Sequence, residues 1–188
     1  MSQLKIFDEN NKLITATKNF TEIKSFLAEI DINIEKWDSS QLKQDSSKEE
    51  IFNIFTDQIE EIKVKHNFKS VDLMDIKKDF AKSENFQTMR AKFLKEHTHS
   101  DDEVRYFISG SGLFTIHKAN KIFSILCEAG DFINVPANTQ HWFDMGSEPE
   151  FKCLRFFSDE SGWVPNYMDD SISHNFENYD EFVNIVKK

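Results

Sequence analysis

The chain has 188 residues, with 23 basic and 33 acidic side chains and a formal charge of −10. This length fits one domain with a substantial apolar core, for which the 39% of hydrophobic residues, including 19 Phe, give ample material. The acidic balance argues against a nucleic-acid partner, because phosphate binding needs a basic surface.

The N-terminal segment MSQLKIFDENNKL has no apolar run typical of a secretory signal. No apolar run elsewhere approaches the roughly 20 residues that span a bilayer. We therefore expect a cytoplasmic protein without membrane contact. Cys127 and Cys153 each lie in an apolar run, which favours two reduced, buried thiols.

The first half of the chain predicts helices after a short strand at 4–7. Asn19 and Glu22 fit a capping box that begins a helix over about 20–30. Ser47 and Glu50 form a second capping box, followed by a helix to about residue 65. The polar stretch between these helices predicts a loop. A short strand is expected from Val71, and apolar residues at helical spacing predict a third helix over about 86–93.

The second half predicts short strands instead. The β-prone runs are VRYFI, GLFTIHK, KIFSIL, DFINV, HWFDM and FKCLRFF. Turn signals separate them at 109–112, 118–121, 128–131, 136–139 and 146–150. Several short strands at regular spacing indicate an antiparallel barrel or sandwich. The tail predicts a loop around SGWVPNYM and a short terminal helix at about 176–187.

The segment HTHSDDE carries the strongest chemical signal. His97 and His99 are two residues apart, so in an extended segment both imidazoles point to the same side. The turn that follows brings Glu103 round as a carboxylate, and His141 in PANTQHWF offers a fourth group from another strand. Three imidazoles and a carboxylate leave two positions of an octahedral ion free, and imidazole suits Fe, Ni, Cu and Zn. The other histidines, His66, His117 and His174, lie in no comparable cluster.

Two histidines at this spacing alone are more often exposed than metal-bound. The glycine-framed patterns H-x-H-x3-E-x6-G and G-x5-P-x4-H, which include Gly110, Gly130 and Pro136, favour the metal site. These patterns resemble the two motifs of the cupin superfamily, a small β-barrel with the metal inside it. Asn138 stands where the second motif usually has glycine, and Asn tolerates the left-handed turn that this position needs.

More narrowly, EHTHSDDEVRYFISGSGLF, DFINVPANTQHWFDMGSEPEFKCLRFF and GWV resemble the bacterial-type acireductone dioxygenase family over about residues 70–168. The resemblance implies a mainly β fold, a cupin-type antiparallel β-barrel of the jelly-roll kind, with helices mostly from the N-terminal half. We expect a single domain over 1–188, with a helical part at 1–70, the barrel and metal site at 71–160 and a tail at 161–188.

Carried over by position, the family pattern makes His97, His99, Glu103 and His141 the ligands of one Fe²⁺ or Ni²⁺ ion. Glu96 matches a residue implicated in metal incorporation. Asp102 matches an acidic position thought to relay local conformational change, although the family often has Glu there.

Arg105 matches an arginine that helps to generate and hold the substrate dianion. It lies two residues beyond Glu103 on the same strand face, so its guanidinium could neutralise an enediolate; an exposed surface ion pair is the alternative. Arg155 lies in an apolar run and needs a partner, either an anionic substrate or a structural carboxylate. Phe107, Phe143 and Trp163 could line the substrate's apolar tail or simply pack in the core.

The resemblance implies that O₂ cleaves 1,2-dihydroxy-5-(methylthio)pent-1-en-3-one (acireductone) in methionine salvage. Iron enzyme would yield 4-methylthio-2-oxobutanoate and formate, and nickel enzyme methylthiopropanoate, formate and CO. The alternatives are another cupin enzyme, such as an isomerase or other small-molecule dioxygenase, and a non-catalytic metal-binding cupin. Nothing in the sequence requires a dimer, so we expect a monomer.

Overall fold

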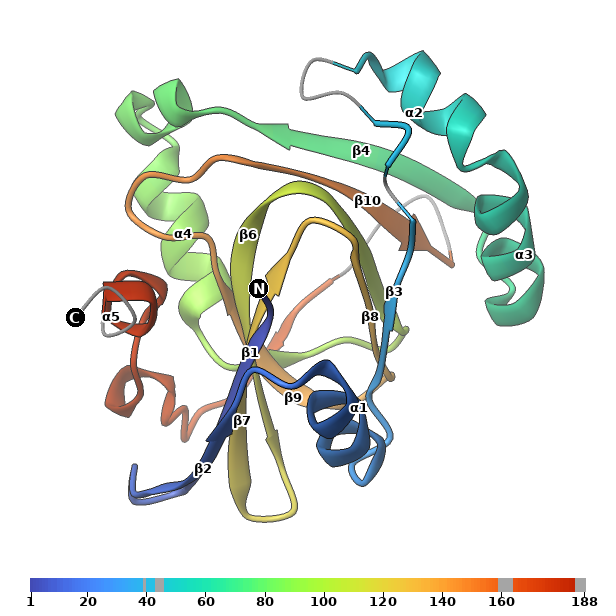
Figure 1. The fold of residues 1–188 in the computed structure, drawn as a ribbon. Coiled ribbons are helices and arrows are strands. Elements are labelled where there is room, and N and C mark those ends of the chain that lie inside the picture. The colour runs from blue at the N-terminus through green and yellow to red at the C-terminus, as the bar shows by residue number, and fades with distance from the viewer. Residues whose placement is uncertain (39, 43–45, 159–163, 185–188) are drawn as a thin grey trace.

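The computed structural model describes residues 1–38, 40–42, 46–158 and 164–184. The first half of the chain contains both strands and helices (Figure 1). Their bounds are β1 Gln3–Asp8, β2 Leu13–Thr17, α1 Phe20–Ala28, β3 Asn33–Lys36, α2 Lys48–Ile54, α3 Thr56–His66, β4 Ser70–Ile76, the 3₁₀ helix η1 Lys78–Lys82 and α4 Phe86–Leu94.

The second half is almost entirely strand up to residue 157. Its elements are β5 His97–Thr98, β6 Glu103–Lys118, β7 Lys121–Glu128, β8 Asp131–Val135, β9 Gln140–Asp144, β10 Phe151–Phe157, β11 Asn166–Tyr167, η2 Ser173–Asn175 and α5 Tyr179–Asn184.

The sheet is built around β6. The first part of β6 pairs with β8 and β10, and its second part pairs with β7 and β9, in each case antiparallel. The main strand order is β11-β5-β9-β6-β7-β1-β2, while β10 also pairs with β4 and β8 with β3. The two parts of β6 thus join two groups of strands. The sheet curls around an interior, as expected for a cupin-type jelly roll (Figure 1).

The predicted turn at 109–112 is wrong, because β6 runs through it as one strand of 16 residues. Gly110 has φ +70°, which permits a sharp bend without breaking the strand. A side chain at Gly110 would also collide with the backbone of Glu150 and Phe151 on the neighbouring chain segment. The glycines of SGSG therefore bend a strand where the sequence suggested that it ends.

The N-terminal part contains more strand than the sequence predicted. Strands β1 and β2 extend the sheet beyond β7, and β3 pairs with β8. Strand β2 is an edge strand with little burial, and β3 has only four residues, so neither shows a clear alternation of apolar and polar residues. All strands of the described residues belong to one sheet. We therefore propose that the chain is one domain, without a separate helical part.

The predicted helix over 48–65 is two helices with a break at Phe55. The backbone of Phe55 is not helical (φ −101°, ψ 17°), and its ring is buried against Trp37 and Tyr106. Helices α2 and α3 pack on the outer side of the sheet, in a core cluster that Val104, Leu154 and other apolar residues complete.

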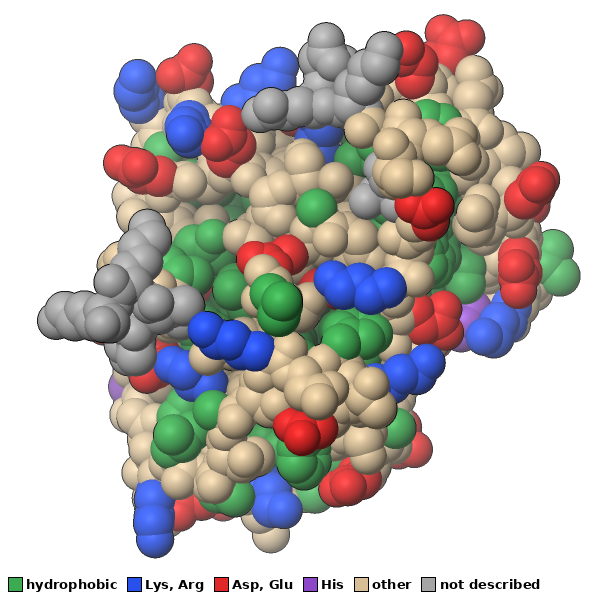
Figure 2. Space-filling model, in the orientation of Figure 1, with side chains coloured by type: hydrophobic (Ala, Val, Ile, Leu, Met, Phe, Trp, Pro, Cys, Tyr) green, Lys and Arg blue, Asp and Glu red, His purple; other side chains and the backbone are tan. Residues whose placement is uncertain are grey.

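A second, larger cluster fills the interior of the sheet with Phe107, Phe114, Phe143 and Phe151. Cys127 and Cys153 are free and buried in it, as predicted. In the described part of the chain, no helix is long and apolar enough to cross a membrane. Acidic and basic side chains intermingle on the face shown in Figure 2, where the described residues form no extended basic area.

Candidate metal centre

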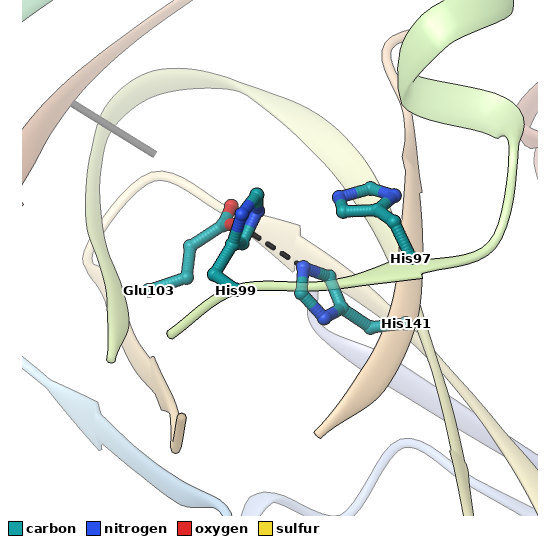
Figure 3. A group of neighbouring side chains, drawn as sticks. All are labelled: His97, His99, Glu103 and His141. Atoms are coloured by element: carbon teal, nitrogen blue, oxygen red, sulfur yellow. Dashed lines mark hydrogen bonds and ion pairs between the residues drawn. The ribbon is translucent and has the colours of Figure 1, made fainter. Parts of the chain in front are cut away.

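Four side chains from three strands and one loop converge inside the sheet. His97 lies on β5, His99 just after it, Glu103 begins β6, and His141 lies on β9. Their ligand atoms all lie within 4.8 Å of one another, and all four residues are buried. In Figure 3 the three rings and the carboxylate face a common centre. This is the only such group of His, Cys, Asp and Glu in the described residues, and it is the one that the sequence predicted.

Backbone pairing brings the two motifs together. His97 is the direct partner of His141 across β5 and β9. Asn138 has φ +61°, the left-handed turn expected there, and its N–H donates to the His99 carbonyl over 2.8 Å. Asp102 accepts from the backbone N–H of Ala137 at 3.0 Å. Asp102 thus ties the turn before Glu103 to the turn before His141.

Each imidazole is oriented by a backbone carbonyl. Nδ1 of His97, His99 and His141 lies 2.6, 3.1 and 2.8 Å from the carbonyl oxygens of Lys95, Val164 and Thr139, respectively. A carbonyl accepts only, so each Nδ1 donates a proton to its carbonyl, and each Nε2 faces the centre, where it can bind a metal once it carries no proton. This arrangement of hydrogen bonds around the ligands is typical of metal-binding histidines.

Glu103 divides its two oxygens between the centre and Arg105. Oε2 lies 3.1 Å from Nε2 of both His99 and His141. Oε1 accepts from Nε of Arg105 over 2.8 Å. Burial opposes the charged carboxylate, but Arg105 and the two histidines outweigh it and hold the pKa of Glu103 well below its usual range.

The histidines differ in their electrostatics. Burial, reinforced by the neighbouring His141, lowers the pKa of His97 to about 4. Burial also opposes charge on His99, but its hydrogen bond and attraction to Glu103 raise its pKa. An uncharged His97 beside an ionised Glu103 is the protonation state that a metal site requires.

Three imidazole nitrogens and one carboxylate oxygen form a donor set that fits Fe²⁺, Ni²⁺ or another first-row divalent metal. All four donors converge from buried, hydrogen-bonded side chains, so little would have to move for an ion to bind. The residues therefore fit the metal that the motifs imply.

Arg105 is buried beside this centre among aromatic rings, which argues against the surface ion pair. Its guanidinium carbon lies 4.4, 5.3 and 5.9 Å from the ring centroids of Phe143, Phe114 and Phe93. The flat guanidinium is thus confined by attraction to the ring faces as well as by Glu103. The sequence had indicated neither Phe93 nor Phe114, because helix α4 and the far half of β6 approach Arg105 only in the folded chain.

The remaining predicted pocket residues have different outcomes. Phe107 is fully buried, with its ring 6.5 Å from that of Phe143. Arg155 is directly opposite Arg105 across β10 and β6. It also forms a bidentate ion pair with Asp72 at 2.9 and 2.6 Å, so it has the structural carboxylate partner. Trp163 lies outside the described residues.

Glu96, the residue before His97, is buried, with 2% of its surface exposed. Its Oε1 lies 2.6 Å from Nδ1 of His117, whose Nε2 lies 3.0 Å from Glu9. Burial opposes charge on His117, but hydrogen bonds to Glu9 and Glu96 raise its pKa. The sequence reading of His117 as isolated missed this contact, since 21 residues separate it from Glu96.

Comparisons with known proteins find relatives along nearly the whole chain. A family model described as the ARD/ARD′ family matches residues 3–165. An acireductone dioxygenase of Aquifex aeolicus (strain VF5) is 42% identical over 185 residues, which is 98% of this chain and all of that protein. One of Xylella fastidiosa (strain 9a5c) is 40% identical over 182 residues, or 95% of each.

The solved structure of an acireductone dioxygenase from Bacillus anthracis, with a cadmium ion in its active centre, superposes with a TM-score of 0.77. It is 31% identical, and the match covers 89% of this chain and 98% of that one. With the family model spanning most of the chain and relatives of this identity along nearly its whole length, the chain belongs to the ARD/ARD′ family of acireductone dioxygenases.

Proposed function

We propose that this protein is a metal-dependent dioxygenase that cleaves acireductone with O₂. The observation that carries the proposal is the convergence of three imidazole Nε2 atoms and the Glu103 carboxylate beside a buried arginine. The choice of acireductone as the substrate rests on the name of the relatives, acireductone dioxygenase. We further propose Fe²⁺ or Ni²⁺ as the ion, one per chain, held by His97, His99, Glu103 and His141.

Arg105 is the proposed catalytic residue. An enediolate carries negative charge into a buried site, where a fixed cation is worth more than in water. Arg105 is already ordered by Glu103 and by Phe143, so it needs no rearrangement to meet that charge. A metal ion bound here would supply Lewis acidity and a template for the substrate oxygens.

The apolar tail of the substrate needs a pocket surface of apolar side chains that excludes water. Phe107 and Phe143 are buried in the interior cluster next to Arg105, and we propose that they line this part of the pocket. Arg155 is the proposed second cation of the pocket, since it lies directly opposite Arg105. We propose that Glu96 supports metal incorporation and that Asp102 transmits movement between the two motif turns, which it already connects.

The decisive experiment is oxygen uptake by metal-free protein reconstituted with Fe²⁺ or Ni²⁺ and supplied with acireductone. We expect 4-methylthio-2-oxobutanoate and formate with iron, and methylthiopropanoate, formate and CO with nickel. The His99→Ala variant is the control, since it loses one of the four ligands and should lose metal and turnover together. If both metals bind stoichiometrically but no oxygen is consumed, the substrate proposal fails, and another cupin activity must be sought.

We also propose that the protein acts as a monomer in the cytoplasm, without nucleic-acid or membrane partners. The intermingled charges of Figure 2 support the part of this proposal that concerns nucleic acid. Light scattering on the purified protein and fractionation of cells test the other parts. A dimeric mass or recovery with membranes would contradict them.

A further inference from the structure

Strand β5, which carries His97, has little support from its own backbone. It contains only two residues. On one side it meets β9 at a single pair, His97 with His141, and on the other it meets the equally short β11. A ladder this short fixes the direction of a strand poorly, so the position of the His97 ring depends on contacts outside the ladder.

Glu96, immediately before His97, provides those contacts. Its carbonyl accepts from Met168 N–H at 3.0 Å, and its own N–H donates to Ser171 Oγ at 3.3 Å. Its carboxylate accepts from Ile172 N–H at 3.1 Å through Oε2. These three bonds all lead to the C-terminal segment 168–172.

The fourth bond of Glu96, which Oε1 accepts from Nδ1 of His117, leads to the sheet instead. His117 lies near the end of β6, the strand that begins with Glu103. Its neighbour Ile116 is the direct partner of the ligand His141 on β9. Side chains alternate along a strand, so His117 lies on the outer face while Ile116 and His141 share the inner one.

We propose that His117 is a positioning residue for the metal centre: through Glu96 it fixes His97 relative to the strands that carry Glu103 and His141. The role rests on the proposed metal site but does not depend on the substrate. Without the Nδ1 bond, the peptide before His97 is joined to the sheet only through its short ladder and the C-terminal segment. The buried Oε1 of Glu96 also loses a charge-assisted partner.

The two ring nitrogens of His117 provide a matched pair of variants. In His117→Asn the amide nitrogen takes roughly the place of Nδ1 and keeps the bond to Glu96. In His117→Gln it takes roughly the place of Nε2 and keeps only the bond to Glu9, whose side chain is 47% exposed. Glu9→Gln removes charge from the outer contact alone and serves as the control.

The measurement is Ni²⁺ affinity of the metal-free proteins, by competition with a chromophoric chelator well below their melting temperatures. Changes in the hydrogen bonds behind metal ligands typically cost about 10–100-fold in affinity. We expect His117→Gln to bind about 10-fold more weakly or worse, and His117→Asn and Glu9→Gln to stay within about 3-fold of the unmodified protein. Melting temperatures of the metal-free variants separate this effect from loss of folding, because a purely structural role would lower stability without separating Asn from Gln in affinity.

Equal affinity of His117→Gln and the unmodified protein overturns the inference, and so does an equal loss in the Asn and Gln variants. Failure of the unmodified protein to bind Ni²⁺ or Fe²⁺ overturns the proposed function as well. If the unmodified protein binds the metal tightly but consumes no oxygen, the proposed substrate is wrong. The comparison of metal affinities then still tests the role of His117.

Discussion

Replacing Arg105 with Met should destabilise the metal-free protein far more than the metal-loaded one. Arg105 and Glu103 are each 2% exposed and are joined by a 2.8 Å hydrogen bond. Met fills much of the space of the arginine stem but leaves Glu103 as a buried carboxylate without its strongest cation. Breaking a buried pair in this way costs about 3–5 kcal/mol.

A divalent ion held by the four residues would reduce that cost, because it would supply positive charge next to Glu103. For a chain of this size, each kcal/mol moves the melting temperature by roughly 2–4 °C. The metal-free Arg105→Met protein should therefore melt on the order of 6–20 °C below the unmodified one. We expect less than half of that shift when both proteins are loaded with Ni²⁺.

Thermal unfolding by circular dichroism, with and without metal, measures both shifts. In a Glu103→Gln background the Arg105→Met change should cost less, because no carboxylate is left unpaired. A metal-free loss below about 1 kcal/mol, or the same loss with and without metal, would refute the electrostatic reasoning. With metal and substrate, Arg105→Met should lower kcat/KM by about 100-fold or more, as expected for loss of a fixed charge at a reacting anion.

Three other perturbations test the scaffold. Gly110→Ala forces a side chain into a left-handed backbone against neighbouring main chain, so urea unfolding should show a loss of about 2 kcal/mol or more; a loss near zero would mean that β6 can shift there. Arg90→Met removes the bidentate partner of the buried Asp144 at 2.8 and 2.9 Å. Because Asp144 keeps its backbone donors Gly146 and Tyr179, the loss by the same measurement should be about 1.5–3 kcal/mol, and a neutral result would show that those donors satisfy Asp144 alone. Burial raises the pKa of Cys153 to about 11 and that of Cys127 well above its usual range, so both thiols should resist alkylation at pH 8 until the protein unfolds. Because the unfolded thiols ionise first, stability should also fall as pH rises from about 9 toward 11, and a Cys127→Ala, Cys153→Ala protein should show a smaller fall.

The sequence predicted the ligand set because its spacing is local. His97, His99 and Glu103 lie within seven consecutive residues, and the glycine and proline framing of His141 completes the pattern. The left-handed turn at Asn138 was predicted from the second cupin motif, which usually has glycine at that position. The starts of two helices were also predicted: Asn19 caps α1 through its side chain alone, whereas Ser47 and Glu50 form the full capping box at α2.

Features that depend on distant partners were not predicted. The glycines around Gly110 have the composition of a turn, and only the pairing of this stretch with β10 and β7 shows that the strand continues. Helix α2 ends at Ile54, and the ring of the next residue, Phe55, packs in an aromatic cluster with Trp37 and Tyr106. The periodicity of the helix does not encode that packing.

The backbone carbonyls that orient the three imidazoles affect which positions of this sequence can tolerate substitution. Lys95, Thr139 and Val164 hold the rings through main-chain oxygen, which every amino acid possesses. Mutations at these three positions can therefore accumulate without reorienting a ligand, as long as the local backbone path survives. A library randomised there should retain many metal-binding members, whereas one randomised at the ligands should retain almost none. For protein engineers, these sites offer room to tune the surroundings of the ion while its coordinating groups stay untouched.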